Sequence, residues 1–130
     1  MIKYPNRIKQ VLDFRGVGDS KIHPSDIDAI LEFNDEYLLI FEVKYKGVSV
    51  PYGQKLLFQR IADAWQESRK EAFVIYCEHE TSTDEIVGMQ NAVVKSVYHN
   101  KKYFPRDENI RVFLHKLADQ YKIQKLKQSL

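Results

Sequence analysis

Residues 25–44, SDIDAILEFNDEYLLIFEVK, decide the fold of this chain. All of the charged residues of residues 26–32 and 38–44 fall at every second position, and a period of two is typical of β-strands. Asn34, Asp35 and Glu36 lie between the two runs and favour a short turn. The stretch therefore predicts a β-hairpin.

The charged side chains of this hairpin fall on one face. If the loop is centred on Asp35, Asp28 lies opposite Glu42 and Asp26 lies opposite Lys44. Directly opposed side chains have Cβ atoms roughly 4.5–5.5 Å apart, and like charges placed that way repel each other. A divalent cation would relieve the repulsion, because Mg²⁺ is held by one or two carboxylates and takes its other ligands from water and substrate phosphate.

Lys44 lies one pleat repeat beyond Glu42, where its ammonium group could orient or deprotonate an attacking water or stabilise charge on a phosphate. The alternative is a half-solvated hairpin in which Glu42 and Lys44 form a surface ion pair, which would contribute little to the stability of the fold. Two features favour the site. Residues 37–43, YLLIFEV, are apolar enough for a central strand covered on both faces, where a glutamate needs another explanation. Pro24 gives the aspartates an extended entry into the strand.

The motifs PSDID at residues 24–28 and EVK at residues 42–44, followed by Gln54 at the start of an expected helix, resemble the PD-(D/E)XK nuclease superfamily. This is the fold of many restriction enzymes, Holliday-junction resolvases and phage or repair nucleases. The glycine-containing segment 47–54 is similar to the loop that leads many compact members into their central helix.

The resemblance implies roles for five residues. Asp28 would be the first metal ligand and Glu42 the second, with Asp26 as the alternative to Asp28. Lys44 would be the catalytic lysine, and Gln54 would support the metal site or the scissile phosphate; a plain first-turn residue is the other reading of Gln54. The implied cofactor is Mg²⁺ or Mn²⁺.

The expected fold class is α/β, with a restriction-endonuclease-like αββαβ core, a mixed central sheet flanked by helices, and a C-terminal helix. Its elements are a helix over residues 6–15, the hairpin, a helix over residues 54–66 and a buried strand over residues 72–77. The buried face of the second helix is marked by Leu57, Phe58, Ile61, Ala62 and Trp65.

Four segments complete the chain. Residues 78–85 read as a polar loop, in which His79 is more readily explained by solvation than by chemistry. Residues 92–98 read as a further strand, and residues 101–106 as an exposed loop that is basic and aromatic. A final helix, fraying into lysines at its end, is marked by Ile110, Phe113, Leu114, Leu117, Ala118 and Tyr121.

Composition fits one domain over residues 1–130. Hydrophobic residues make up 44% of the chain and charged residues 29%, which is ordinary for a globular protein. No apolar run approaches the roughly 20 residues that span a membrane, and the N-terminus lacks a signal peptide's apolar stretch, so we expect no membrane partner and a cytoplasmic location. Cys77 is the single cysteine and reads as a buried thiol.

The net charge of +2 is too small to identify a nucleic-acid binder, so the placement of the cations matters more. Cations that could line a groove for phosphates, beside aromatic side chains for bases, are Lys46, Lys55, Lys101, Lys102 and Arg106. The four histidines match no zinc spacing, and the chain has neither a phosphate-cradling loop nor a nucleophile elbow.

The expected function is a divalent-metal-dependent nuclease that hydrolyses DNA, guided by the substrate's structure, in phage or mobile-element replication, recombination or defence. The alternative is a catalytically inactive module of the same fold that binds nucleic acid or a protein. A homodimer is possible, because symmetric cutting of a duplex requires two copies.

Overall fold

The computed structural model describes residues 15–17 and 24–130. The elements, in chain order, are β1 (Ala29–Phe33), β2 (Tyr37–Tyr45), α1 (Tyr52–Gln66), β3 (Glu71–His79), the 3₁₀-helix η2 (Met89–Asn91), β4 (Val93–His99), β5 (Lys102–Asn109), α2 (Ile110–Tyr121) and α3 (Gln124–Gln128). The helix predicted over residues 6–15 lies outside the described residues, apart from Arg15, which forms an isolated β-bridge.

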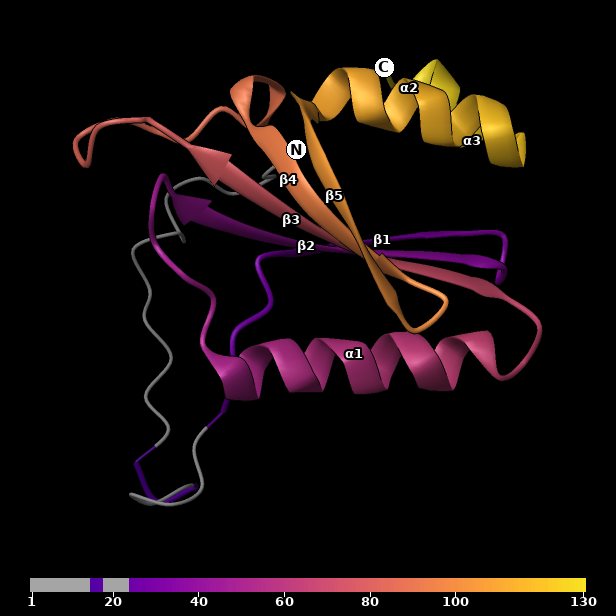
Figure 1. The fold of residues 1–130 in the computed structure, drawn as a ribbon, viewed down its shortest axis with the longest axis horizontal. Coiled ribbons are helices and arrows are strands. Elements are labelled where there is room, and N and C mark those ends of the chain that lie inside the picture. Colours follow the sequence, from indigo (N-terminus) through magenta and orange to yellow (C-terminus); the bar gives the residue numbers. More distant parts are fainter. Residues whose placement is uncertain (1–14, 18–23) are drawn as a thin grey trace.

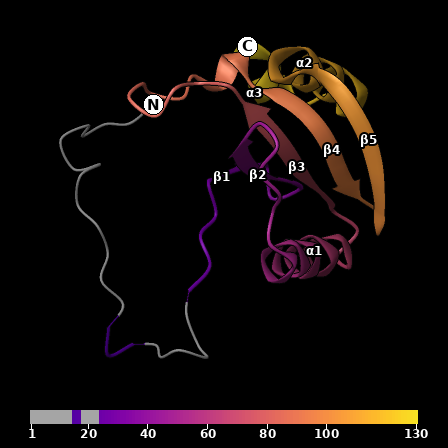
Figure 2. The same ribbon diagram turned by 60° about the vertical axis from the view of Figure 1, so that its left-hand side comes forward.

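The protein is a mixed α/β structure built on one five-stranded sheet of order β1-β2-β3-β4-β5. β2 and β3 are parallel and the other neighbouring strands are antiparallel. The parallel pair needs a crossover connection, which α1 supplies. α1 covers one face of the sheet, here called the α1 face, and α2 with α3 covers the other, the α2 face (Figure 1). Figure 2 shows the same two layers from a second direction.

The predicted hairpin is confirmed, and β1 pairs with β2 in the expected register about Asp35. Asn34 and Asp35 have φ values of 57° and 59°, a left-handed conformation that Asn and Asp adopt more readily than most residues. The first strand is shorter than predicted. It begins at Ala29, so Asp26 and Asp28 precede it as extended chain.

Side chains of the strands alternate between two hydrophobic clusters. On the α1 face the buried residues are Leu38, Ile40, Phe58, Ala62, Ala72, Val74, Tyr76 and Tyr98. The α2 face holds the larger cluster, which includes Leu39, Phe41, Phe73, Ile75, Cys77, Val94, Val97, Phe113, Leu117 and Ile123. Five consecutive residues of β2, from Leu38 to Glu42, are buried, which confirms the prediction of a strand covered on both faces.

Residues 101–106 are not the loop that the sequence predicted. Lys101 lies in a turn, and residues 102–106 form most of β5, an edge strand paired with β4. Asn100 and Lys101 form the turn, with φ values of 51° and 61°. Two-residue hairpin turns of this conformation usually have the sequence Asn-Gly, so a lysine at the second position does not indicate a hairpin. Pro105 and the strand's charges suggested a loop, yet an edge strand accommodates both.

The C-terminal helix is confirmed as α2, but the predicted fraying is wrong. α2 ends at Tyr121, and the capping residue Lys122 takes the left-handed conformation with a φ of 55°. The chain then turns into α3, and Ile123 and Leu126 are buried in the α2-face cluster. Because the left-handed residue is a lysine and not a glycine, no residue pattern marks the turn at this position.

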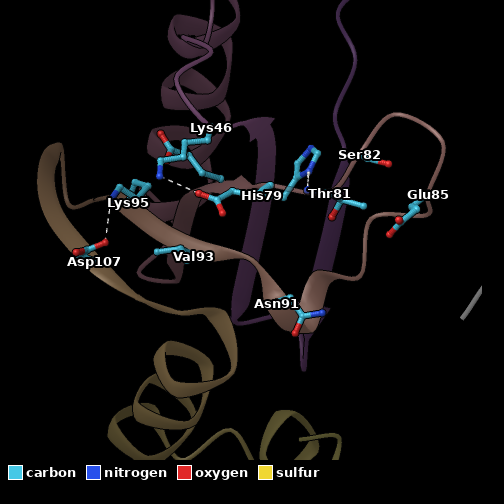
Figure 3. Close-up of a pocket in the computed structure, with 11 residues that line it drawn as sticks. Lys46, His79, Thr81, Ser82, Glu85, Asn91, Val93, Lys95 and Asp107 are labelled. Atoms are coloured by element: carbon cyan, nitrogen blue, oxygen red, sulfur yellow. Dashed lines mark hydrogen bonds and ion pairs between the residues drawn. The ribbon is translucent and has the colours of Figure 1, made fainter.

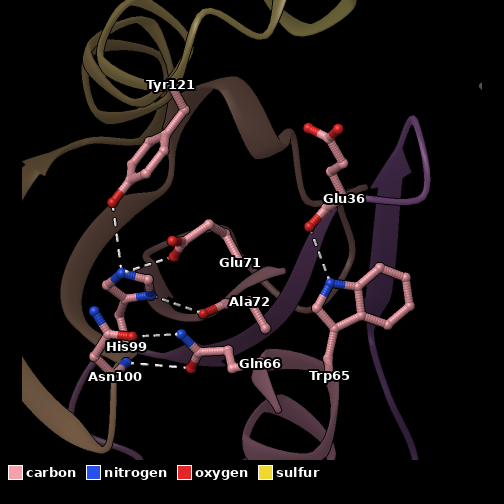
Figure 4. Close-up of polar contacts among 8 residues, drawn as sticks. All are labelled: Glu36, Trp65, Gln66, Glu71, Ala72, His99, Asn100 and Tyr121. Atoms are coloured by element: carbon pink, nitrogen blue, oxygen red, sulfur yellow. Dashed lines mark hydrogen bonds and ion pairs between the residues drawn. The ribbon is translucent and has the colours of Figure 1, made fainter. Parts of the chain in front are cut away.

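The C-terminal end of α1 holds both hairpin turns in place (Figure 4). Trp65 Nε1 donates to Glu36 O at 3.1 Å, beside the β1–β2 turn. At the other turn, Gln66 Nε2 donates to Asn100 Oδ1 at 2.7 Å and its Oε1 accepts from Asn100 N at 3.2 Å. Because these hydrogen bonds hold the C-terminal end of α1 against the sheet, they also set the position of its N-terminal end, which lies near the acidic residues of the sheet.

Candidate functional site

Glu42 is the buried charged residue at the centre of the site. It lies in β2 on the α1 face, directly after the apolar run, and only 1% of it is exposed. Lys44 Nζ lies 2.9 Å from its Oε1, and Gln54 Nε2 lies 3.5 Å from its Oε2. Oε1 of this buried carboxylate is therefore in an ion pair with Lys44.

The two aspartates approach Glu42 from the extended chain before β1. Asp28 Oδ2 accepts a hydrogen bond from Val43 N at 2.7 Å, which ties this carboxylate to the strand of Glu42. Gln54 Nε2 donates to the backbone oxygen of Asp26 at 2.8 Å. Gln54 thus connects the start of α1 with the segment before β1.

The structure therefore brings Asp28, Lys44 and Gln54 to Glu42, whereas Asp26 is tied to the group through its backbone oxygen. Sequence reasoning located them because the hairpin register and the start of α1 were both readable from local patterns. It did not foresee that the side chain of Asp28 would bond to the backbone of β2.

Electrostatics around Glu42 favour an added positive charge. Burial raises the pKa of Glu42 above its ordinary value, and the charge of Asp28 acts in the same direction, whereas Lys44 opposes the rise. The pKa of Lys44 is also raised, first by its contact with Glu42 and further by the charges of Asp28 and Asp26. Lys44 is therefore a cation at neutral pH, which favours charge stabilisation or water orientation over proton abstraction.

The donor set around Glu42 fits a hard divalent cation. Asp28 and Glu42 present carboxylate oxygens, the ligands that Mg²⁺ takes, and the repulsion between the two charges would be relieved by a cation. Over residues 15–17 and 24–130 no group of three or more His, Cys, Asp or Glu side chains is placed to hold a metal. A metal would thus rest on two carboxylates, as Mg²⁺ commonly does.

Lys55 is the proposed DNA-binding cation that lies nearest to this site along the chain. It follows Gln54 in the first turn of α1. Its Nζ lies 4.7 Å from the centre of the Tyr103 ring and 5.7 Å from that of Tyr76. Tyr76 is the direct neighbour of Glu42 across the β2–β3 pair.

The other proposed cations do not share one groove with Lys55. Arg106 lines a hollow with Phe113 and Leu117 on the α2 face, so the expected single groove is wrong for this residue. β5 is a strand, and its alternation sends Arg106 and Tyr103 to opposite faces. Lys102 opens β5 opposite His99, and Lys101 lies in the preceding turn.

Lys46 lies in a separate hollow of about 630 Å³ beyond the end of β3 (Figure 3). Its Nζ lies 2.8 Å from Glu80 Oε1, and both side chains are exposed. His79 also lines this hollow and is the last residue of β3, not part of a loop as predicted. Its Nδ1 accepts from Thr81 N at 3.2 Å.

Tyr76 is the residue of this face that sequence reasoning missed, whereas Tyr103 was expected among the aromatic residues of the groove. Tyr76 lies within an apolar run that reads as core, and Tyr103 lies in the segment that was predicted as a loop. The Tyr76 hydroxyl is buried and has no hydrogen-bond partner in the described residues. Burial raises its pKa, with Tyr103 as the next cause and Glu42 a smaller one. The period-two alternation of residues 72–77 would have placed Tyr76 on the face of Glu42 once the strands were paired.

No family model, curated protein or solved structure matches this chain. No helix of the described residues is long and apolar enough to cross a membrane. The side chains around Glu42 are therefore the basis on which a function is inferred.

Proposed function

We propose that the chain is a divalent-metal-dependent nuclease that hydrolyses DNA phosphodiester bonds. The observation that carries the proposal is the convergence of Asp28, Lys44 and Gln54 on the buried carboxylate of Glu42. The arrangement β1-β2-α1-β3, with β3 parallel to β2, supports a restriction-endonuclease-like core.

Asp28 and Glu42 would hold Mg²⁺ or Mn²⁺, with Asp26 as the alternative first ligand. When bound, the ion would supply positive charge at the scissile phosphate and lower the pKa of a coordinated water. The buried position of Glu42 keeps its carboxylate fixed, because β2 is paired on both sides and Gln54 contacts its second oxygen.

Lys44 would act on the substrate through its charge. Hydrolysis joins a water oxygen to phosphorus and breaks the bond to one ester oxygen, and negative charge builds on the phosphate oxygens in between. A fixed ammonium near those oxygens lowers the barrier. Its exposed fraction of 30%, compared with 1% for Glu42, lets Lys44 reach a ligand while it remains paired with the carboxylate.

Cleavage of labelled single-stranded, duplex and branched DNA tests the proposal, with Mg²⁺, Mn²⁺ or EDTA in parallel reactions. We expect the wild type to cut in either metal and not in EDTA. Lys44→Ala and Glu42→Gln should both lose activity by about 100-fold or more, the usual effect of removing one group that stabilises transition-state charge. Lys95→Ala is the matched control, because Lys95 also pairs with a carboxylate, Asp107, but outside the site.

Equal cutting by wild type and Lys44→Ala would show a contaminating nuclease and overturn the assignment. DNA binding without cleavage would instead support the alternative of an inactive nucleic-acid-binding module. The mass of the protein on duplex DNA, measured by analytical ultracentrifugation, would show whether two copies act together.

A further inference from the structure

We infer that Lys55 and Tyr103 form a subsite for an unpaired nucleotide next to the scissile phosphate, so that the preferred substrate is single-stranded DNA or the single-stranded part of a branched molecule. This inference rests on the proposed function and specifies its substrate.

The subsite is continuous with the acidic residues. Glu42 on β2 lies beside Tyr76 on β3, and the Tyr76 and Tyr103 ring centres are 6.2 Å apart. Tyr103 on β5 also lies against Tyr98, with ring centres 5.0 Å apart. The α1 face thus carries a path of aromatic rings from the carboxylates to the edge of the sheet.

Lys55 gives this path a positive charge. Among the described residues no carboxylate lies within ion-pair distance of Lys55, whereas Lys44 and Lys46 are paired with Glu42 and Glu80. Its ammonium instead lies over the ring of Tyr103 at 4.7 Å. A contact between a cation and a ring is weaker than a charge-assisted hydrogen bond, so a phosphate can draw the lysine away from the ring.

Tyr103 then offers its ring to a base. It is 40% exposed although it packs against two other tyrosines. Gln59 donates a hydrogen bond to its hydroxyl, which fixes the ring beside α1. Bases stack on such rings when they are unpaired, because in a duplex both faces of each base are already covered.

The turn of the β4–β5 hairpin and its neighbouring strand are also held in place from α1. Asp63 accepts from the Tyr98 hydroxyl at 2.8 Å, and Gln66 bonds to Asn100 at the turn. The platform therefore exists before any ligand arrives, which lowers the entropy cost of binding.

Binding in EDTA tests the inference without any cleavage. The probes are a fluorescein-labelled oligothymidylate and a duplex of the same length, followed by fluorescence anisotropy at one salt concentration. We expect wild type to prefer the single strand. Tyr103→Leu should weaken single-strand binding about tenfold and leave duplex binding unchanged, because stacking is lost. Tyr103→Phe keeps the ring and should bind as wild type does.

Lys55→Met should weaken the binding of both probes. It should also reduce the slope of log affinity against log salt concentration by about one unit, as expected for the loss of a phosphate contact. An equal loss on both probes, or no loss, in a folded Tyr103→Leu protein would overturn the subsite. If that variant fails to fold, wild type alone decides, because equal affinity for the two probes excludes the inference.

The two proposals fail separately. A preference for single strands that depends on Tyr103, with no metal-dependent cutting, would leave the subsite standing and remove the nuclease. Metal-dependent cutting with equal affinity for single strand and duplex would support the nuclease and remove the subsite.

Discussion

Glu42 occupies a position where most strands would carry an apolar residue. It continues the buried run of β2 and contacts Lys44 and Gln54 at its two oxygens. Nearby Asp28 adds a second negative charge that raises the pKa of Glu42. At the scale of single residues, the protein thus accepts an electrostatic cost that a bound cation would offset.

Two substitutions of Asp28 separate its charge from its hydrogen bond. Asp28→Asn keeps an oxygen for Val43 N and removes the repulsion with Glu42, so the metal-free protein should be at least as stable as wild type. Asp28→Ala removes the acceptor and should cost about 1 kcal/mol.

Thermal melts with and without Mg²⁺ measure both effects. Mg²⁺ should raise the melting temperature of wild type and leave that of Asp28→Asn unchanged. A clearly lower melting temperature of metal-free Asp28→Asn would mean that the negative charge of Asp28 is structural.

The buried hydroxyl of Tyr76 gives a second prediction for a single residue. Among the described residues it has no hydrogen-bond partner, so Tyr76→Phe should raise the free energy of unfolding by about 1 kcal/mol. Tyr98→Phe is the matched control, because that hydroxyl donates to Asp63 at 2.8 Å and its loss should lower stability by a similar amount. Urea unfolding of the two variants gives the comparison; a loss of stability in Tyr76→Phe would show that its hydroxyl does make a bond.

At the scale of elements, the predictable parts were those with local signals. The register of β1 and β2 followed from the Asn34–Asp35 turn, and α1, β3, β4 and α2 followed from their apolar periodicity. The residues proposed for the acidic site came from the same local patterns. β5 and α3 were missed because lysines, at positions 101 and 122, take left-handed turn conformations that sequence patterns assign to glycine or asparagine.

The β4–β5 turn yields a prediction of its own. Lys101 has a φ of 61°, and glycine adopts that conformation without the steric cost that a side chain brings. Lys101→Gly should therefore raise the free energy of unfolding by about 1 kcal/mol. Lys102→Gly, one residue into β5, should lower it instead, because glycine weakens strands. Equal effects of the two substitutions in urea unfolding would contradict the turn conformation.

At the scale of the whole molecule, stability should fall in alkaline solution. Burial raises the pKa of Cys77 from its ordinary 9.0 to about 12, and burial with the contact to Asp63 raises that of Tyr98 from 10.0 to about 12. Between pH 9 and 12 the unfolded chain thus binds fewer protons than the folded one, so the free energy of unfolding declines. Below pH 9 these contributions are fully present.

Cys77→Ala isolates the thiol's part of this decline. A single group contributes a slope of at most about 1.4 kcal/mol per pH unit, and the variant should lose that part of the slope between pH 9 and 12. Urea unfolding across this range, for wild type and variant, provides the measurement. Identical slopes would mean that the thiol is accessible to solvent in the folded protein.

The parallel pairing of β2 with β3 has a consequence for the order in which the molecule can assemble. The β1–β2 and β4–β5 hairpins join residues that are near in sequence, whereas β2 meets β3 only after α1 has crossed the sheet. Contacts between distant segments form slowly, because the chain entropy of closing the long loop is lost first. Glu42 and Tyr76 meet across that pairing, so the acidic residues and their aromatic neighbours come together only when this long-range contact forms.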